Sequence, residues 1–133
     1  MIDEKQEIEC TRFEPIIKHR FMARFEDIPN YAVRNVSNIK FIKGKYQDII
    51  IKLYDIVTPS ITKRLTELIT GRSSESDDFT LKLQILGEED DIIREWIIRT
   101  HDISIDFGNF DYASDSLNSI IITMLNPRCI LNF

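Results

Sequence analysis

Two histidines, two cysteines and one run of four acids are the side chains whose chemistry could hold a metal ion. His19 and His101 lack further ligands at the spacing that zinc sites use. His19 lies within an alternating apolar segment, which favours a core or interface histidine. Cys10 and Cys129 have neither metal spacing nor a disulfide framework, and we interpret them as reduced thiols in a cytosolic protein.

The acidic run Glu88-Glu89-Asp90-Asp91 could in principle bind a hard cation. It lacks the alternating oxygen ligands and the central glycine of a calcium loop, so we interpret it as a solvated acidic turn. The sequence therefore predicts no metal site and no cofactor.

Catalytic motifs are missing as well. Ser114-Asp115-Ser116 is not the glycine-flanked nucleophile motif, and glycines at 44, 71, 87 and 108 cannot build a phosphate-binding loop. Trp96 beside Glu95 could stack a ligand, but a single tryptophan among isoleucines is more often a core residue. We predict that the protein is not an enzyme and that its role is structural.

Length and composition indicate what kind of fold positions these residues. The 133 residues fit one domain, with 43% apolar and 29% charged residues. A net charge of −5 argues against binding to duplex DNA or to an anionic membrane. The apolar runs are far too short to span a bilayer. We expect a charged arm over residues 1–12 and a single domain over residues 13–133.

Alternation predicts several strands in the first half of the chain. Ile16 to Phe25 alternates, with His19 and Phe21 on its apolar face, and Val33 to Lys43 follows as a strand with a bulge or register break. Lys43 to Lys45 then forms a tight connection. In the next strand, the run Ile49-Ile50-Ile51 suits coverage on both faces, inside a barrel wall or at a subunit contact.

One helix is predicted after these strands. Thr58 can cap it, Pro59 suits its first position, and Gly71 is a natural stop. Between them, apolar residues recur at helical spacing at Ile61, Leu65, Leu68 and Ile69.

The second half of the chain predicts further strands after a polar loop. Phe79 to Leu86 alternates cleanly, and shorter alternating segments follow at Ile103 to Phe107 and Ile120 to Met124. Glu88 to His101 fits a helix and a strand equally well, because its apolar residues match both periods.

These segments predict a mainly β (α+β) fold, a barrel or sandwich of about six or seven strands with one flanking α-helix. The predicted core residues are the apolar side chains that recur on one face of these strands: Phe21, Phe79, Leu81, Leu83, Ile85, Trp96, Phe107, Ile120 and Ile122.

Two parts of the chain carry a family resemblance. The first is Phe13 to Phe25 followed by Val33 to Val36. The second runs from Phe79 to Thr123, through the acidic turn, Ile93 to Ile98 and Ile105 to Tyr112. Their order resembles the tail tube proteins of contractile phages of the T-even type, which are similar to the tube protein of type VI secretion.

This resemblance implies a structural virion protein, assembled in the host cytoplasm into a phage tail. Six copies would join their sheets into a ring, and rings would stack into a tube inside a sheath. The implied partners are identical copies and the tail sheath, baseplate and tape-measure proteins, with DNA only as passing cargo and no membrane. It also implies that residues 88–101 form a strand with Trp96 packed inside.

In such a ring, each exposed edge strand would pair with a strand of an identical neighbour, which is how unprotected sheet edges can be satisfied. We expect subunit contacts at Ile49, Ile50 and Ile51, and contacts between rings at residues 1–12 and at Arg72, Ser73, Ser74 and Glu75. A conduit for DNA should also have a neutral to acidic inner wall.

The sequence departs from the family in two ways. Glu88 to Asp91 replaces a turn that usually holds a glycine, and the chain is short. One alternative is therefore a baseplate or tail-end protein of the same fold that nucleates or caps the tube. Another is a monomeric β-barrel module that binds a peptide or small ligand.

Overall fold

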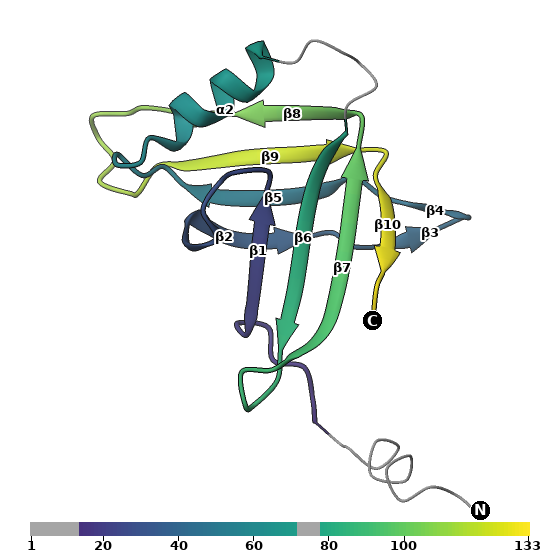
Figure 1. Cartoon of the computed structure of the whole chain (residues 1–133). Coiled ribbons are helices and arrows are strands. Elements are labelled where there is room, and N and C mark those ends of the chain that lie inside the picture. Colours follow the sequence, from purple (N-terminus) through teal and green to yellow (C-terminus); the bar gives the residue numbers. More distant parts are fainter. Residues whose placement is uncertain (1–13, 72–77) are drawn as a thin grey trace, which may run out of the picture.

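The computed structural model describes residues 14–71 and 78–133, which form two four-stranded antiparallel sheets, a small hairpin and one α-helix (Figure 1). The first sheet has the order β1 (Phe21–Phe25), β6 (Phe79–Leu86), β7 (Ile92–Thr100) and β10 (Arg128–Leu131). The second has the order β2 (Val33–Ser37), β5 (Ile49–Tyr54), β9 (Ser119–Leu125) and β8 (Asp102–Asp106). The hairpin pairs β3 (Phe41–Ile42) with β4 (Lys45–Tyr46), and the helix is α2 (Ile61–Thr70).

The predicted mainly β fold with one α-helix is confirmed, although the described residues contain ten strands instead of six or seven. Strands of the first sheet cross those of the second at a steep angle (Figure 1), the orthogonal form of sheet packing. Apolar residues at alternate positions of the strands form the core, because every second residue of β5, β6 and β9 points between the sheets. Leu53, Leu81 and Ile122 are among the fully buried residues.

One long bent hairpin joins the two sheets. β7 continues into β8 and β9 into β10, and the register is the same on both sides of the corner: Asp102 pairs with Leu125, and Arg99 pairs with Arg128. At the corner the buried Thr100 hydroxyl donates to the carbonyl of Leu125 and accepts from the amide of Asp102 at 3.2 Å. Such strands, which pass from one sheet to the other, make the corners of orthogonal sandwiches.

The first predicted strand is too long. β1 begins at Phe21 instead of Ile16, because residues 17–20 form a turn in which the Arg20 amide donates to the Ile17 carbonyl at 3.0 Å. His19 is therefore an exposed turn residue and not a core residue.

The second predicted strand is divided. β2 ends at Ser37, and Asn38 adopts a positive φ of 71° before β3 begins. This interruption confirms the predicted break between Val36 and Ile42, and the register of β2 also shifts earlier, between Val33 and Asn35. The predicted tight connection is also confirmed, with Gly44 at φ 82° between β3 and β4, a conformation that glycine adopts readily.

The helix is present but begins later than predicted. Its N-cap is Ser60, whose side chain accepts from the Lys63 amide at 3.2 Å, so Thr58 and Pro59 precede the helix. Gly71 is its C-cap, as predicted, and Ile61 and Leu65 are buried against the sheets.

Glu88 to His101, whose apolar residues match both helical and strand spacing, contains the strand β7. β7 pairs with β6 on one side and β10 on the other, and main-chain pairing of eight of its residues with β6 outweighs the helical pattern. Trp96 is half-buried and contacts the ring of Tyr46 edge-on, with 6.3 Å between ring centroids.

Candidate assembly interface

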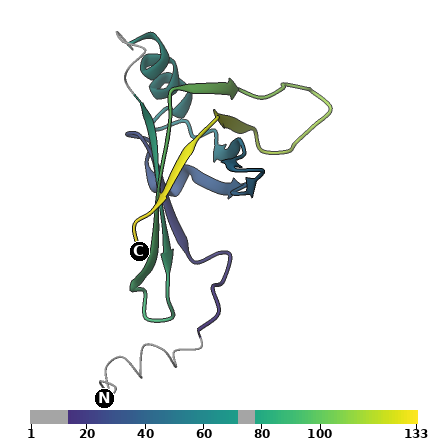
Figure 2. The same cartoon turned by 90° about the vertical axis from the view of Figure 1, so that its right-hand side faces the viewer.

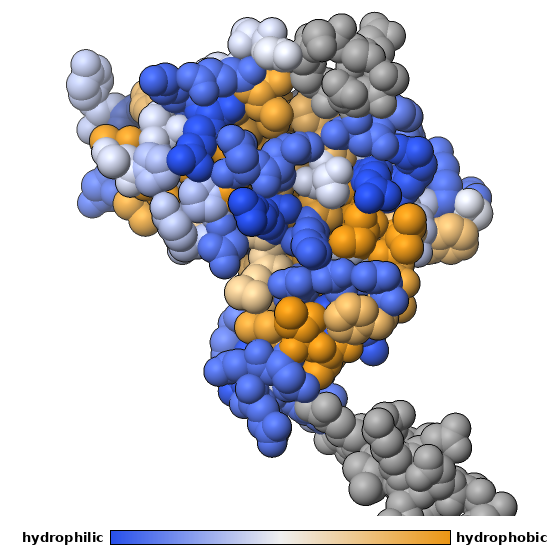
Figure 3. All heavy atoms as spheres, viewed as in Figure 1, coloured by the Kyte–Doolittle hydropathy of each residue, from blue (hydrophilic) through white to orange (hydrophobic). Residues whose placement is uncertain are grey.

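Two sheets with open edges are the first feature that could bind another chain. β1 and β10 are the outer strands of the first sheet, and β2 and β8 are those of the second. An exposed edge presents main-chain donors and acceptors to any strand that can pair with it. The β10 edge is also apolar, because Ile130, Leu131 and Phe133 are about half exposed. Figure 3 shows an apolar area over β7 and β10.

The loop between β8 and β9, residues 107–118, is the second feature. It projects away from the sheets (Figure 2) and carries Phe110, Tyr112 and Leu117 with 76% or more of each exposed. Large apolar side chains that stay in water at a loop tip do not stabilise the single chain, and clusters of this kind mark interaction sites.

Asn118 anchors the base of this loop. Its side-chain amide donates to Asp55 at 2.8 Å and to the carbonyl of Phe107 at 3.0 Å. The other carboxylate oxygen of Asp55 accepts from Thr62 at 3.2 Å, which ties the loop to α2. Gly108 is required here, because it has φ 101° and a Cβ would lie 2.0 Å from the Asn118 side chain. The aromatic tip is thus held on a defined base.

An apolar groove opens beside the start of β1. Its volume is about 600 Å³, and Phe21, Val36, Ile39, Leu83 and Ile85 contribute apolar walls. Phe21, Leu83 and Ile85 belong to the first sheet, Val36 belongs to the second, and Ile39 follows β2. All are half-buried or buried, so the groove is an opening in the core between β1 and β2. It is of a size and polarity that fit large apolar side chains.

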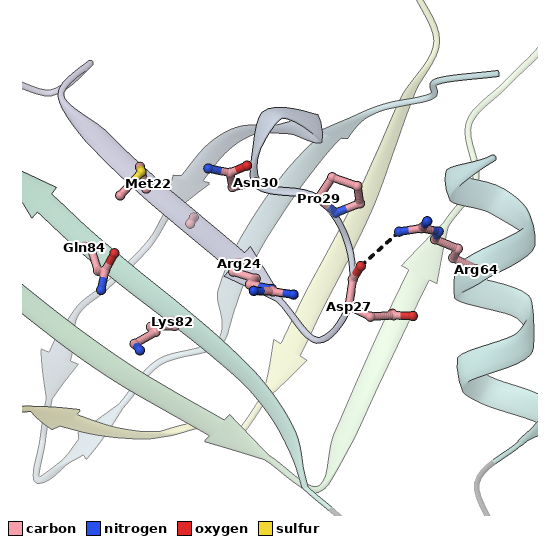
Figure 4. A pocket seen from close by; sticks show the side chains of 9 residues that line it. Met22, Arg24, Asp27, Pro29, Asn30, Arg64, Lys82 and Gln84 are labelled. Atoms are coloured by element: carbon pink, nitrogen blue, oxygen red, sulfur yellow. Dashed lines mark hydrogen bonds between the residues drawn. The ribbon is translucent and has the colours of Figure 1, made fainter. Parts of the chain in front are cut away.

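A cationic pocket lies on the outer face of the first sheet (Figure 4). Arg24, Lys82 and Arg64 line it with Asp27, and its volume is about 510 Å³. Arg64 donates to the main-chain carbonyl of Asp27 at 3.0 Å. The pocket can hold an anionic group by charge and hydrogen bonding.

Glu95 is a buried carboxylate on the same outer face. One oxygen accepts from Gln84 at 2.7 Å and the other from Asn132 at 2.8 Å, while Lys82 lies 3.8 Å away. The hydrogen bonds from Gln84 and Asn132, aided by the charge of Lys82, hold the pKa of Glu95 below its ordinary value. The arrangement ties the C-terminal residues to β7, which keeps the β10 edge in place.

Five of the predicted core residues are buried, namely Phe79, Leu81, Leu83, Ile120 and Ile122. The other four, Phe21, Ile85, Trp96 and Phe107, are partly buried and pack against this core.

The predicted subunit contacts need a correction. Ile49 and Ile51 are fully buried within one chain, because β5 is a central strand whose inner face they share. They belong to the core, and only the half-buried Ile50 points to the other face. Residues 1–12 and Arg72, Ser73, Ser74 and Glu75 lie outside the described residues.

The described residues offer no cluster of three or more His, Cys, Asp and Glu side chains that could hold a metal ion. Burial raises the pKa of the Cys129 thiol to about 11. Among residues 14–71 and 78–133, no helix is long and apolar enough to cross a membrane.

Sequence reasoning missed the aromatic loop tip and the cationic pocket. Phe110 and Tyr112 stand in a polar segment that has no apolar period, a signal that could have marked them as exposed. Arg24, Arg64 and Lys82 come from three separate elements, so only the fold brings them together.

No known protein family and no curated protein matches the sequence. Among solved structures, the fold is similar to a chain in the cryo-EM structure of the anti-feeding prophage baseplate, 6-fold symmetrised, with a TM-score of 0.56 and 14% identity. The match covers 90% of this chain and 97% of that chain. At this identity the likeness is one of fold.

Proposed function

We propose that this chain is a structural subunit of a contractile phage-tail-like particle, in which six copies join into a ring and rings stack into a tail tube. The observation that carries the proposal is the bent hairpin, which exposes apolar side chains at both ends. Phe110 and Tyr112 stand at its loop, and Ile130 and Phe133 stand at its free end. The fold likeness to a chain of a six-fold symmetrised baseplate supports it.

A ring gives these surfaces partners. Each copy would offer the aromatic loop tip to the apolar groove of its neighbour, and the β10 edge to a neighbouring strand. Such a contact joins two different surfaces of the same chain, and it closes when the rotation between neighbours divides a full turn. Every copy then buries both its loop tip and its groove.

The second candidate is a baseplate subunit of the same fold, which makes one ring and nucleates or caps the tube. The similar structure favours it, because that chain belongs to a baseplate and is matched over 97% of its length.

In either role the protein is a non-catalytic component of the particle. The tube would contact the sheath, baseplate and tape-measure proteins and pass DNA without holding it. We expect an inner wall that is neutral to acidic, and therefore that the cationic face with Arg24 and Lys82 does not line the conduit.

Negative-stain electron microscopy of the purified chain separates these roles. Tubes or stacked rings support the tube subunit, and single rings support the baseplate subunit. Monomers, both alone and beside an assembled baseplate, contradict both and favour a module that binds a peptide or small ligand.

A further inference from the structure

The cationic pocket on the first sheet brings together side chains from three elements. Arg24 comes from β1, Lys82 from β6 and Arg64 from α2 (Figure 4). Of the described residues that line the pocket, Asp27 alone is acidic. The lining thus carries a net positive charge, although the whole chain carries −5. A concave surface of one sign attracts a partner of the opposite sign.

The charges in the pocket are only partly compensated from within. Arg64 donates to the main-chain oxygen of Asp27, so this bond does not neutralise its charge. Lys82 lies 3.8 Å from Glu95, but that carboxylate already accepts short hydrogen bonds from Gln84 and Asn132. Arg24 is exposed at the centre of the lining. Guanidinium and ammonium groups in this setting favour a carboxylate-rich occupant.

The pocket follows β1 from Met22 to Asp27, and its cationic side chains lie toward the end of that strand. Arg24 and Asp27 stand where β1 ends. At the other end, the Leu86 amide donates to the Arg20 carbonyl at 2.9 Å, and the Glu88 amide donates to the Glu14 side chain. Residues 14–20 continue past the turn between β6 and β7 (Figure 1). The chain therefore enters the domain at the start of β1, while the cationic side chains of the pocket lie toward the end of β1.

The segment that precedes residue 14 has the composition this pocket requires. Residues 1–12 contain Asp3, Glu4, Glu7 and Glu9 against Lys5 and Arg12, so they are net acidic. Twelve residues can span up to about 40 Å when extended, enough to reach an adjacent copy.

We propose that the acidic arm, residues 1–12, of one copy binds in the cationic pocket of the next copy along the assembly axis. This inference rests on the proposed ring-and-stack assembly and adds the contact that joins successive rings. The arm precedes the start of β1 and the cationic side chains lie toward the end of β1, so the contact joins two different surfaces of the chain. When neighbouring copies are related by a step along the assembly axis, such a contact does not close on itself. It therefore builds a stack, whereas the loop and groove build the ring.

Cys10 provides a direct test, because it lies within the arm. In the full-length chain, Asn30→Cys places a thiol on the rim of the pocket (Figure 4). Mild oxidation at neutral pH should then give disulfide-linked chains on a non-reducing gel, with the Cys10 link to the introduced thiol identified by peptide mass spectrometry. The native Cys129 competes poorly, because burial raises its pKa to about 11 and leaves little thiolate.

Two sets of variants show whether charge holds the arm. Arg24→Glu together with Lys82→Glu should lower the yield of linked chains about tenfold, since several exposed charge pairs become repulsive. Adding Asp3→Lys and Glu4→Lys should restore it. Ser104→Cys on the exposed face of β8 is the matched control and should give few links to Cys10.

Three results would overturn the arm assignment. Disulfides could form only within one chain, Ser104→Cys could give the same yield of links to Cys10 as Asn30→Cys, or the charge reversals could leave the yield unchanged. The gel measures contacts of the arm, and electron microscopy measures ring formation, so the two results are independent. Rings without intermolecular arm links leave the ring proposal standing and reject the arm. Linked chains without rings support the arm and reject the ring.

Discussion

Asn118 donates its side-chain amide to the carboxylate of Asp55 at 2.8 Å, and this bond joins the base of the aromatic loop to the end of β5. The Asp55 amide returns the contact by donating to the Asn118 carbonyl at 3.3 Å. A loop that carries exposed aromatic residues is therefore fixed at its root while its tip faces water. A flexible root would add an ordering cost to any contact that the tip makes.

Asp55→Ala should destabilise the fold by about 1–3 kcal/mol, because the amide of Asn118 and the hydroxyl of Thr62 lose their acceptor. Urea unfolding followed by circular dichroism measures this change. Chymotrypsin should also cut faster at Phe110 and Tyr112. Asp115→Ala, in the same exposed loop, is the control and should leave the unfolding midpoint nearly unchanged. Equal midpoints for Asp55→Ala and the parent would show that the anchor is unimportant.

Phe110→Ser combined with Tyr112→Ser should abolish assembly while leaving stability nearly unchanged, because both side chains are already in water in the single chain. Sedimentation velocity reads the assembly state, and thermal unfolding reads stability. Val57→Ser removes another exposed apolar side chain from a different place and should leave assembly intact. Full assembly by the double variant would reject the loop tip as a contact.

Ile51→Ala should cost about 2–5 kcal/mol, because the residue is fully buried on the central strand β5. Ile50→Ala, on the other face of the same strand, should cost less. If Ile50 is a subunit contact, its replacement should instead shift the equilibrium between monomer and assembly. Urea unfolding and sedimentation of both variants separate the two roles, and similar stabilities would contradict the burial argument.

Glu95 should make stability depend on pH. Its pKa is lowered in the folded chain, so the ionised carboxylate stabilises the fold above the unfolded pKa of about 4.3, and this contribution is lost as pH falls through the folded value. Unfolding free energies from pH 7 down to pH 3 should show parent and Glu95→Gln converging below about pH 4.3. A constant gap between the parent and Glu95→Gln over this pH range would refute the assignment.

Strict alternation predicted the outline of the fold. Phe79 to Leu86 is a strand with the predicted bounds, because its period of two fits one half-buried face and nothing else. Gly71 ends the helix as predicted. The bounds that failed, at Ile16 and Thr58, depend on a local turn and on the choice between neighbouring cap residues. Periodicity does not register such short-range hydrogen bonds.

The site depends on features that act across the chain. The buried state of Ile49 and Ile51 follows from the central place of β5, since a continuous isoleucine run also fits a surface covered by another subunit. The pocket needs Arg64 from α2 beside Arg24 from β1, and nothing in their spacing predicts that neighbourhood. The tertiary fold determines which charged residues are neighbours, whereas the alternating sequence of a strand predicts only that its charged residues face outward.

Native mass spectrometry of the purified chain shows whether identical copies assemble into a ring. We expect a dominant species of six copies of the 15.6 kDa chain, roughly 94 kDa, or whole multiples of it. Addition of a preassembled baseplate should increase this species if nucleation limits it. A monomer mass at every concentration, with the baseplate present, would contradict the claim that identical copies complete one another's surfaces.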